Sequence, residues 1–447
     1  MRAGMPQFPF DDSKRFSLTT LGCKVNQYES RALAEAWEKA GLSRVDDPAA
    51  ADVAVLVTCA VTARAEAESR RLARQLARQI NPQARPGARA VVTGCAAVVA
   101  PDAFAALGVI VVPDKAGLAR RPFGPDDAAP RADAVFPDLA VTGYDRARGL
   151  VKIQDGCSHG CSYCIVPSGR GASVSRPFPD ILAEAIRLIT AGHREIGLTG
   201  INLGHYGRDL EAPASFWDLL AALDDALAPR YGDTVRLRLG SLDPAMLTEE
   251  GLSVLAAARL VCPHLHISLQ SADPEVLVAM GRRADDANRV SSFVDAIRIK
   301  WPTFGLGCDV LTGFPGESDA AFGRTRDFLS GLPLTYAHVF PYSRRPGTRA
   351  AAMAGQLSKA VKTERARELR ELAAAKKAAF RERLSREARV VVALERHDPA
   401  VGTCGQYVDC RFDAPVAAPL GALVRARPVG RDGDLLLVAP LEAGAGA

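Results

Sequence analysis

The chain carries three closely spaced cysteines in the stretch Gln154-Asp155-Gly156-Cys157-Ser158-His159-Gly160-Cys161-Ser162-Tyr163-Cys164. The thiols are separated by three and then two residues, and they follow an apolar run, Leu150–Ile153, that predicts a strand. A loop with this spacing can place its sulfurs around one corner of an iron–sulfur cube, leaving one iron of a four-iron cluster open to a cofactor or substrate. The alternative is a structural zinc ion, which would need a fourth ligand, and only His159 lies nearby.

Length and composition indicate a multidomain globular protein. The 447 residues suggest two or three domains, and the chain is 24% charged and 48% hydrophobic. The N-terminus, Met1–Arg15, lacks the apolar core of a secretory signal, and the most apolar segment, Ala90–Pro101, is too short to span a membrane. We therefore expect a cytoplasmic protein without membrane contact, whose ten cysteines are ligands or core residues rather than disulfides.

Strand and helix patterns alternate in the first quarter of the chain. Strands are predicted at Phe16–Leu21, Val53–Val57 and Arg89–Thr93, with helices at Tyr28–Ala40 and Thr62–Ile80. A segment rich in Ala, Pro, Asp and Arg follows, Asp114–Thr142, and is predicted to be a linker.

A cysteine follows each of these three strands, namely Cys23, Cys59 and Cys95, at intervals of 36 residues. Right-handed crossovers would bring all three to the carboxyl edge of one parallel sheet, where such sheets bind ligands. The alternative is a set of buried thiols in a small apolar core. Each cysteine comes after its apolar run, and Gly22 and Gly94 leave room for close backbone approach, so a second three-cysteine site is favoured.

The central region repeats the alternation with six predicted strands, which indicates a partial or full parallel barrel with its site at the strands' carboxyl ends. The strands are Leu150–Ile153, Glu195–Leu198, Val235–Leu239, Leu265–Leu269, Leu306–Leu311 and Tyr336–Phe340. The intervening helices are Phe178–Ala191, Phe216–Leu227, Pro244–Ala258, Ala284–Ile299 and Asp319–Leu329.

The C-terminal region begins with a basic helix, Leu357–Arg389, whose apolar stripe should pack on the barrel. Residues 358–389 hold eleven Lys or Arg against five Asp or Glu, an excess larger than the net charge of +5 for the whole chain. Short strands follow at Val390–Leu394, Tyr407–Phe412, Ala422–Pro428 and Leu435–Val438 and predict a small β-barrel, with Glu442–Ala447 as a disordered tail.

These motifs resemble, in order, those of the radical S-adenosylmethionine (SAM) enzymes, and specifically their methylthiotransferase branch, which modifies tRNA. The resembling segments are Thr20–Asn26, Thr58–Thr62, Gly94–Cys95, Lys152–Pro167, Leu198–Gly207, Arg238–Pro244, His264–Arg283, Asp309–Glu317 and Phe340–Thr348. We therefore predict an α/β protein with three domains. They are a flavodoxin-like parallel-sheet domain at residues 1–120, a radical SAM partial (β/α)6 barrel at 143–375 and a TRAM-like RNA-binding β-barrel at 376–442.

The resemblance implies two [4Fe–4S] clusters. Cys23, Cys59 and Cys95 would hold an auxiliary cluster, and Cys157, Cys161 and Cys164 a catalytic one whose open iron binds SAM. A 5′-deoxyadenosyl radical would then remove the unactivated C2 hydrogen of adenine, and a second SAM would methylate a sulfur held on the auxiliary cluster. A reducing electron-donor protein and a sulfur source would also be required.

Five further residues are candidates for binding the cofactor. Tyr163 resembles the position that contacts the adenine of SAM, with ordinary packing as the alternative. Gly200 and Asn202 follow the second strand, where the short glycine-acidic motif of many radical enzymes is not evident. Gln270 and Asp309 could contact the cofactor or could instead make fold-stabilising hydrogen bonds.

Six arginines are predicted to contact RNA. Arg344, Arg345 and Arg349 follow the last barrel strand, and Arg381, Arg383 and Arg386 lie on the basic helix. For the helix, the alternative is a solvated charged face.

The family acts on isopentenyladenosine in tRNA, on threonylcarbamoyladenosine in tRNA, or on an aspartate of a ribosomal protein. Lys24-Val25 and the run His338–Thr348 resemble the threonylcarbamoyl branch most. That modified base carries a carboxylate, which Arg344 and Arg345 could bind, although generic phosphate binding explains them equally well. We therefore predict methylthiolation at C2 of N6-threonylcarbamoyladenosine in the tRNA anticodon stem-loop. A non-catalytic iron–sulfur RNA-binding protein is a further alternative, as is a flavodoxin-like electron carrier, which gives the cysteines no role.

Overall fold

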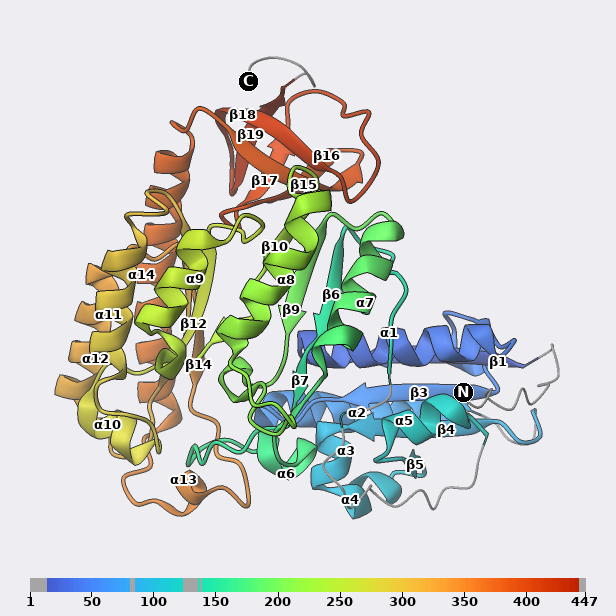
Figure 1. Ribbon diagram of the computed structural model, residues 1–447. Coiled ribbons are helices and arrows are strands. Elements are labelled where there is room, and N and C mark those ends of the chain that lie inside the picture. The colour runs from blue at the N-terminus through green and yellow to red at the C-terminus, as the bar shows by residue number, and fades with distance from the viewer. Residues whose placement is uncertain (1–13, 81–84, 124–135, 137–138, 442–447) are drawn as a thin grey trace. The chain divides into compact units, whose positions relative to one another are not determined.

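Residues 14–80, 85–123, 136 and 139–441 are described by a computed structural model, drawn in Figure 1. The chain forms two compact units. The first consists of Met1–Thr142, Asp155–His159 and Cys164–Val174, and the second of Gly143–Gln154, Gly160–Tyr163 and Ser175–Ala447. The predicted tail, Glu442–Ala447, lies outside the described residues.

The first unit is built on a five-stranded parallel sheet in the order β2-β1-β3-β4-β5. Its strands are β1 (Arg15–Thr20), β2 (Ser43–Arg44), β3 (Val53–Thr58), β4 (Arg89–Gly94) and β5 (Ile110–Val111). This is the strand order of flavodoxin-like sheets, so the predicted fold is confirmed. The sequence missed β2 and β5 because two residues carry no readable period.

Helices cover both faces of this sheet, which is why all six residues of β3 are buried. Ala54 and Leu56 pack in one apolar cluster with side chains of α2 (Ala63–Gln79). Phe16 is in register with Val53, which points to the other face, and its ring packs edge-on against Trp37 of α1 (Lys24–Lys39).

The segment Asp114–Thr142, predicted to be a linker, begins with a helix in the structure. Residues Lys115–Arg120 form a helix, α5, whose Leu118 carbonyl accepts a hydrogen bond from the Trp37 indole at 3.1 Å. The end of the segment is also tied to α1, because Glu35 accepts hydrogen bonds from the backbone N–H and the hydroxyl of Thr142. Three further short helices complete this unit, α3 (Cys95–Val99), α4 (Pro101–Ala105) and α6 (Val166–Arg170), with one 3-10 turn, η1 (Pro48–Ala50).

The second unit contains the six parallel strand positions that the sequence predicted. The strands are β6 (Arg148–Lys152), β9 (Glu195–Thr199), β10 (Arg236–Arg238), β11 (Ser241–Leu242), β12 (His264–Gln270), β13 (Gly305–Thr312) and β14 (Tyr336–Pro341). The helices are α7 (Phe178–Thr190), α8 (Phe216–Tyr231), α9 (Glu249–Ala257), α10 (Pro274–Ala279), α11 (Asp286–Ile297), α12 (Asp319–Gly331) and α13 (Arg349–Ala352), with 3-10 turns η2 (Leu203–His205) and η3 (Pro244–Met246). The short strands β7 (Gln154–Asp155) and β8 (Val174–Ser175) flank the cysteine loop.

The third strand position is interrupted at Gly240, so that β10 pairs with β9 and β11 pairs with β12. The barrel wall therefore consists of two sheets, β10-β9-β6 and β11-β12-β13-β14. A Cβ on Gly240 would lie 2.8 Å from the Leu198 carbonyl oxygen, so the chain can bend here only without a side chain.

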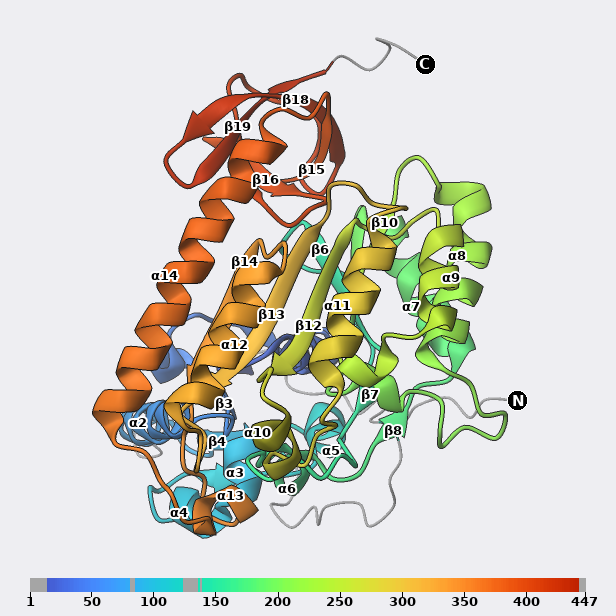
Figure 2. The same ribbon diagram turned by 90° about the vertical axis from the view of Figure 1, so that its left-hand side faces the viewer.

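A long helix, α14 (Lys359–Leu384), runs beside β14 and α12 and leads into the C-terminal barrel (Figure 2). It continues without a break through the domain boundary expected at residue 375. The barrel is closed in the order β15-β16-β17-β19-β18. Its strands are β15 (Val390–His397), β16 (Ala400–Cys404), β17 (Asp409–Phe412), β18 (Leu423–Asp432) and β19 (Leu435–Pro440).

Buried charges attach this barrel to the amino-terminal ends of the central strands. Glu195 at the start of β9 is fully buried and forms ion pairs with Arg148, Arg236 and Arg238. The guanidinium groups of Arg236 and Arg238 also donate to the carbonyls of Val391, Thr403, Cys404 and Gly405. Within the described part of the chain, no helix is long and apolar enough to cross a membrane.

Candidate active site

The three N-terminal cysteines lie at one edge of the first unit's sheet, as the strand pattern predicted. Cys23 is the N-cap of α1 after β1, Cys59 follows β3, and Cys95 begins α3 directly after β4. These three strands are parallel neighbours. Cys59 and Cys95 are buried, whereas Cys23 is exposed.

Two glycines directly precede Cys23 and Cys95, at positions where a side chain would not fit. Gly22 has φ +101°, and a Cβ on it would lie 3.0 Å from the Cys59 sulfur. Gly94 has φ +93°, and a Cβ on it would lie 2.6 Å from the Thr58 carbonyl oxygen. Both positions therefore require glycine, for conformation and for space.

A buried arginine that the sequence did not single out stands beside this cysteine set. The Arg170 side chain is 3% exposed and donates to Glu29 at 2.8 Å, to Asp155 at 2.9 Å and to Asn26 at 2.6 Å. Asn26 in turn donates to the carbonyls of Leu21 and Thr58, which precede Cys23 and Cys59. Arg170 therefore links α6 to two of the cysteine loops.

Helix α6 also packs against the third cysteine, Cys95, through Gly169, the residue before Arg170. A Cβ on Gly169 would lie 3.2 Å from the Cys95 Cα. Burial disfavours the charge of Arg170, but Glu29, Asp155 and Cys95 hold its pKa well above the usual value. Burial raises the pKa of the Cys59 thiol, and Arg170 opposes that rise. A cation is thus in place to stabilise thiolates, the form that binds metal.

The Cys157–Cys164 loop is shaped by its backbone. Gly156 has φ +64°, and a Cβ on it would lie 1.9 Å from the Ala172 carbonyl oxygen. The sulfur of Cys157 accepts from the backbone N–H of His159, and that of Cys164 accepts from the N–H of Val166, each at 3.4 Å. Such N–H donors stabilise negative charge on cluster sulfurs.

In the second unit, a buried arginine, Arg282, lies beside Cys161. Arg282 is 4% exposed, and its Nη1 lies 4.0 Å from the Cys161 sulfur. Its partners are Asp243 at 3.0 Å and Asp286 at 3.4 Å. Burial disfavours its charge, but Asp243 and the other acidic neighbours keep the pKa of Arg282 above its usual value. No sequence signal indicated this role, apart from the position of Arg282 inside the resembling segment His264–Arg283.

Four of the predicted cofactor-binding residues lie in or near the loops that follow the strands' carboxyl ends. Tyr163 is half-buried, and its ring lies edge-on to that of Phe314 with the ring centroids 6.5 Å apart. The backbone N–H of Asn202 donates to Gln154, and its side chain accepts from Gly204 and caps η2. A Cβ on Gly200 would lie 3.0 Å from the same Gln154 oxygen. Gln270, the last residue of β12, has φ +69°, a conformation uncommon for residues other than glycine.

Asp309 lies elsewhere. It stands inside β13 and pairs with His266 at 2.9 Å and with His338 at 3.1 Å. Burial alone would raise the pKa of Asp309, but these imidazoles lower it below its usual value.

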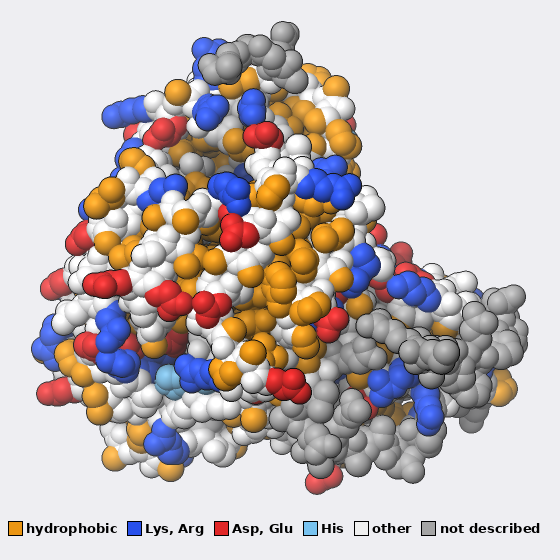
Figure 3. All heavy atoms as spheres, in the orientation of Figure 1, with side chains coloured by type: hydrophobic (Ala, Val, Ile, Leu, Met, Phe, Trp, Pro, Cys, Tyr) orange, Lys and Arg blue, Asp and Glu red, His pale blue; other side chains and the backbone are white. Residues whose placement is uncertain are grey.

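The six predicted RNA-binding arginines do not share one environment. Arg344 and Arg349 are exposed, but Arg345 is buried, so the adjacent Arg344 and Arg345 cannot act as one exposed pair. Arg381 is also buried and forms an ion pair with Asp434 at 2.6 Å, unlike the exposed position expected on a basic helix. Arg383 and Arg386 remain exposed. On the face shown in Figure 3, basic and acidic side chains are interspersed rather than gathered into one basic patch.

Comparison with known proteins shows the class and the family. Residues 151–329 match the radical SAM superfamily, and residues 15–111 match an uncharacterised protein family, UPF0004. Threonylcarbamoyladenosine tRNA methylthiotransferase MtaB of Bacillus subtilis is 34% identical over 78% of this chain and 78% of its own length. MtaB of Thermotoga maritima is 33% identical over 85% of this chain and 86% of its own.

Two other similarities were found. A tRNA-2-methylthio-N(6)-dimethylallyladenosine synthase of Mycobacterium bovis is 33% identical over 79% of this chain and 71% of its own. Among solved structures, the radical SAM methyltransferase TsrM of Kitasatospora setae, with cobalamin and a [4Fe–4S] cluster bound, has a TM-score of 0.55 at 15% identity. That likeness covers 76% of this chain and 74% of TsrM, and it concerns the fold alone.

The fold and the cysteine loop therefore define a radical SAM enzyme, with SAM and a [4Fe–4S] cluster as the cofactors that this class implies. The chain belongs to the tRNA methylthiotransferase family, and it is an enzyme that transfers a methylthio group.

Proposed function

We propose that this enzyme adds a methylthio group to C2 of N6-threonylcarbamoyladenosine, next to the anticodon of tRNA, and that it uses two [4Fe–4S] clusters. The observation that carries the proposal is the presence of two three-cysteine sets: Cys23/Cys59/Cys95, which follow three parallel strands, and Cys157/Cys161/Cys164, which share one loop after β7. Relatives named for threonylcarbamoyladenosine support the substrate, since they match over as much as 86% of their length, against 71% for the dimethylallyladenosine relative.

The residues of the first unit fit an auxiliary cluster. Its three thiols follow neighbouring strands, glycines make space beside them, and Arg170 supplies a buried positive charge. In the Cys157–Cys164 loop, backbone N–H groups donate to the sulfurs of Cys157 and Cys164, and Arg282 supplies a positive charge near Cys161. These groups would stabilise the negative charge of cluster-binding thiolates. When bound, the catalytic cluster and SAM supply the radical chemistry that removal of an unactivated C2 hydrogen requires.

The proposed reaction also needs electrons and sulfur. We propose a reducing protein as the electron donor, a separate source for the transferred sulfur, and the cytoplasm as the location, because the substrate is tRNA. The carboxylate of the modified base would pair with exposed Arg344 or Arg349, since Arg345 is buried.

Deleting the gene should remove 2-methylthio-N6-threonylcarbamoyladenosine from tRNA and leave N6-threonylcarbamoyladenosine in its place. Mass spectrometry of nucleosides from total tRNA measures both species. The methylthio derivative of isopentenyladenosine serves as the internal control and should not change. Loss of that derivative, with the threonylcarbamoyl product intact, would instead favour the substrate of the Mycobacterium relative.

Replacing Arg383 and Arg386 together with glutamine should weaken tRNA binding and lower the slope of log K against log salt by about two, because each phosphate contact releases roughly one counterion. Binding isotherms at several salt concentrations measure both effects. R298Q is a matched control, since Arg298 is an exposed arginine on another helix cap. If the double variant and R298Q had equal slopes of log K against log salt, Arg383 and Arg386 would form a solvated charged face that does not contact tRNA.

A further inference from the structure

Three side chains from adjacent strands converge inside the central barrel, namely His266 of β12, Asp309 of β13 and His338 of β14. The His266 Nε2 lies 2.9 Å and the His338 Nδ1 lies 3.1 Å from the same Asp309 oxygen. All three donor atoms lie within 4.8 Å of one another. Each residue stands three or four positions before the carboxyl end of its strand, about 10–13 Å along the strand from that end.

A second layer of contacts orients the first histidine. The Tyr336 hydroxyl lies 2.9 Å from the His266 Nδ1 and 2.9 Å from the His264 Nε2. A Cβ on Gly307 would lie 2.4 Å from that hydroxyl and 2.5 Å from the His266 Nδ1, so glycine makes the contact possible. Hydrogen bonding through one ring nitrogen leaves the other directed at Asp309, as is usual for metal-binding histidines.

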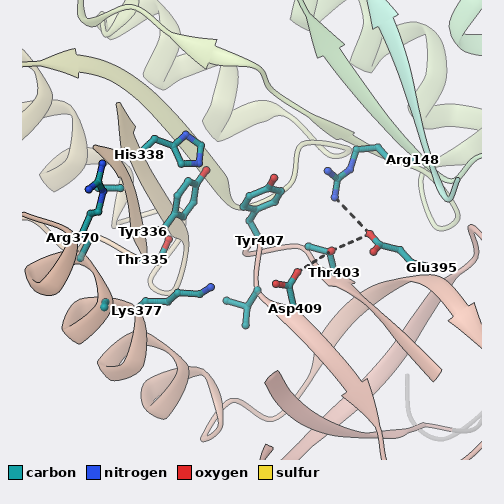
Figure 4. Close-up of a pocket in the computed structure, with 14 residues that line it drawn as sticks. Arg148, Thr335, Tyr336, His338, Arg370, Lys377, Glu395, Thr403, Tyr407 and Asp409 are labelled. Atoms are coloured by element: carbon teal, nitrogen blue, oxygen red, sulfur yellow. Dashed lines mark hydrogen bonds and ion pairs between the residues drawn. The ribbon is translucent and has the colours of Figure 1, made fainter. Parts of the chain in front are cut away.

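The group can be reached from solvent. His338 is 55% exposed and, with Tyr336, lines a cavity of about 540 Å³ (Figure 4). Arg370 and Lys377 of α14 and Tyr407 of the C-terminal barrel line the same cavity. An ion held by the three side chains would therefore have space for water or another ligand in its remaining positions.

We propose that His266, Asp309 and His338 bind one divalent first-row transition-metal ion at a site separate from both cysteine sets. Two imidazoles and one carboxylate suit zinc, iron(II) or manganese(II). Bonds of about 2.1 Å require neighbouring donor atoms roughly 3.0–3.4 Å apart. The 2.9 Å contact therefore needs to open only slightly, the 3.1 Å contact already fits, and the two imidazole nitrogens, within 4.8 Å of each other, need to move closer. The exposed His338 supplies that freedom. The proposal is independent of the tRNA substrate.

The test uses manganese(II) as the probe, because this ion prefers nitrogen and oxygen donors and competes poorly for the cysteines. The full-length protein with reconstituted clusters is titrated with Mn²⁺, and loss of the free-ion EPR signal is measured. We expect one saturable site, at least about tenfold weaker in H338Q and H266Q. H397Q is the matched control, since His397 is an exposed histidine at the end of β15.

H338D separates ligation from packing, because aspartate supplies a ligand oxygen and should retain most of the affinity that H338Q loses. Thermal unfolding of each variant reports whether the fold is kept, and the exposure of His338 makes H338Q the decisive variant. Absence of a saturable site at millimolar Mn²⁺, or equal affinity in the wild type and H338Q, would show a hydrogen-bonded His–Asp–His group only.

Discussion

Replacing Cys157, Cys161 and Cys164 together with alanine will leave the reconstituted protein with about four irons instead of about eight and will abolish reductive cleavage of SAM. The reason is that SAM is expected at the open iron of the cluster that these thiols hold. Iron analysis and chromatographic detection of 5′-deoxyadenosine under dithionite measure the two effects.

The matched variant replaces Cys23, Cys59 and Cys95 with alanine. It should also lose about half of the iron but should still cleave SAM, while transferring no methylthio group. Full iron content in this variant would contradict the proposal of two clusters. Loss of cleavage in both variants would show that the two cysteine sets serve one centre.

The Arg170→Met variant is expected to lower the free energy of unfolding by about 3–5 kcal/mol. The cause is burial, because the substitution removes the arginine partner of Asp155 and leaves Glu29, which is 2% exposed, with Lys115 as its ion-pair partner in place of two cations. Urea denaturation of the cluster-free protein measures the change. Arg170→Lys keeps the charge but not the fork that reaches Glu29, Asp155 and Asn26, so its loss should be smaller.

R71M is the control for this experiment. Arg71 pairs with Glu68 on the surface of α2, and both side chains are largely exposed, so its removal should change stability little. Arg170→Met should also reduce the iron held by the Cys23, Cys59 and Cys95 set after reconstitution. A stability loss no larger than that of R71M would show that the Arg170 network does not support the first unit.

Short sequence patterns were enough to predict most of the strands and helices. The predicted strands of the first region agree with β1, β3 and β4 to within one residue at each end, because each is a short run of β-branched and apolar residues bounded by turns. The strand β16 was missed, since Ala400–Cys404 consists mostly of small residues. A Cβ on its Gly402 would lie 2.0 Å from the Ala393 carbonyl oxygen, a closeness that only the assembled barrel shows.

The cysteine sets were readable from the sequence, because chain order and the handedness of crossovers fix where strand ends fall. The supporting charges were not. Arg170 meets Glu29 across 141 residues of chain, and Arg282 meets Cys161 across 121. Likewise, only the packed structure shows that Arg345 and Arg381 are buried and that Asp309 lies between two histidines. Periodicity and spacing are local properties, whereas the burial and the partners of one charged side chain depend on residues far away in sequence.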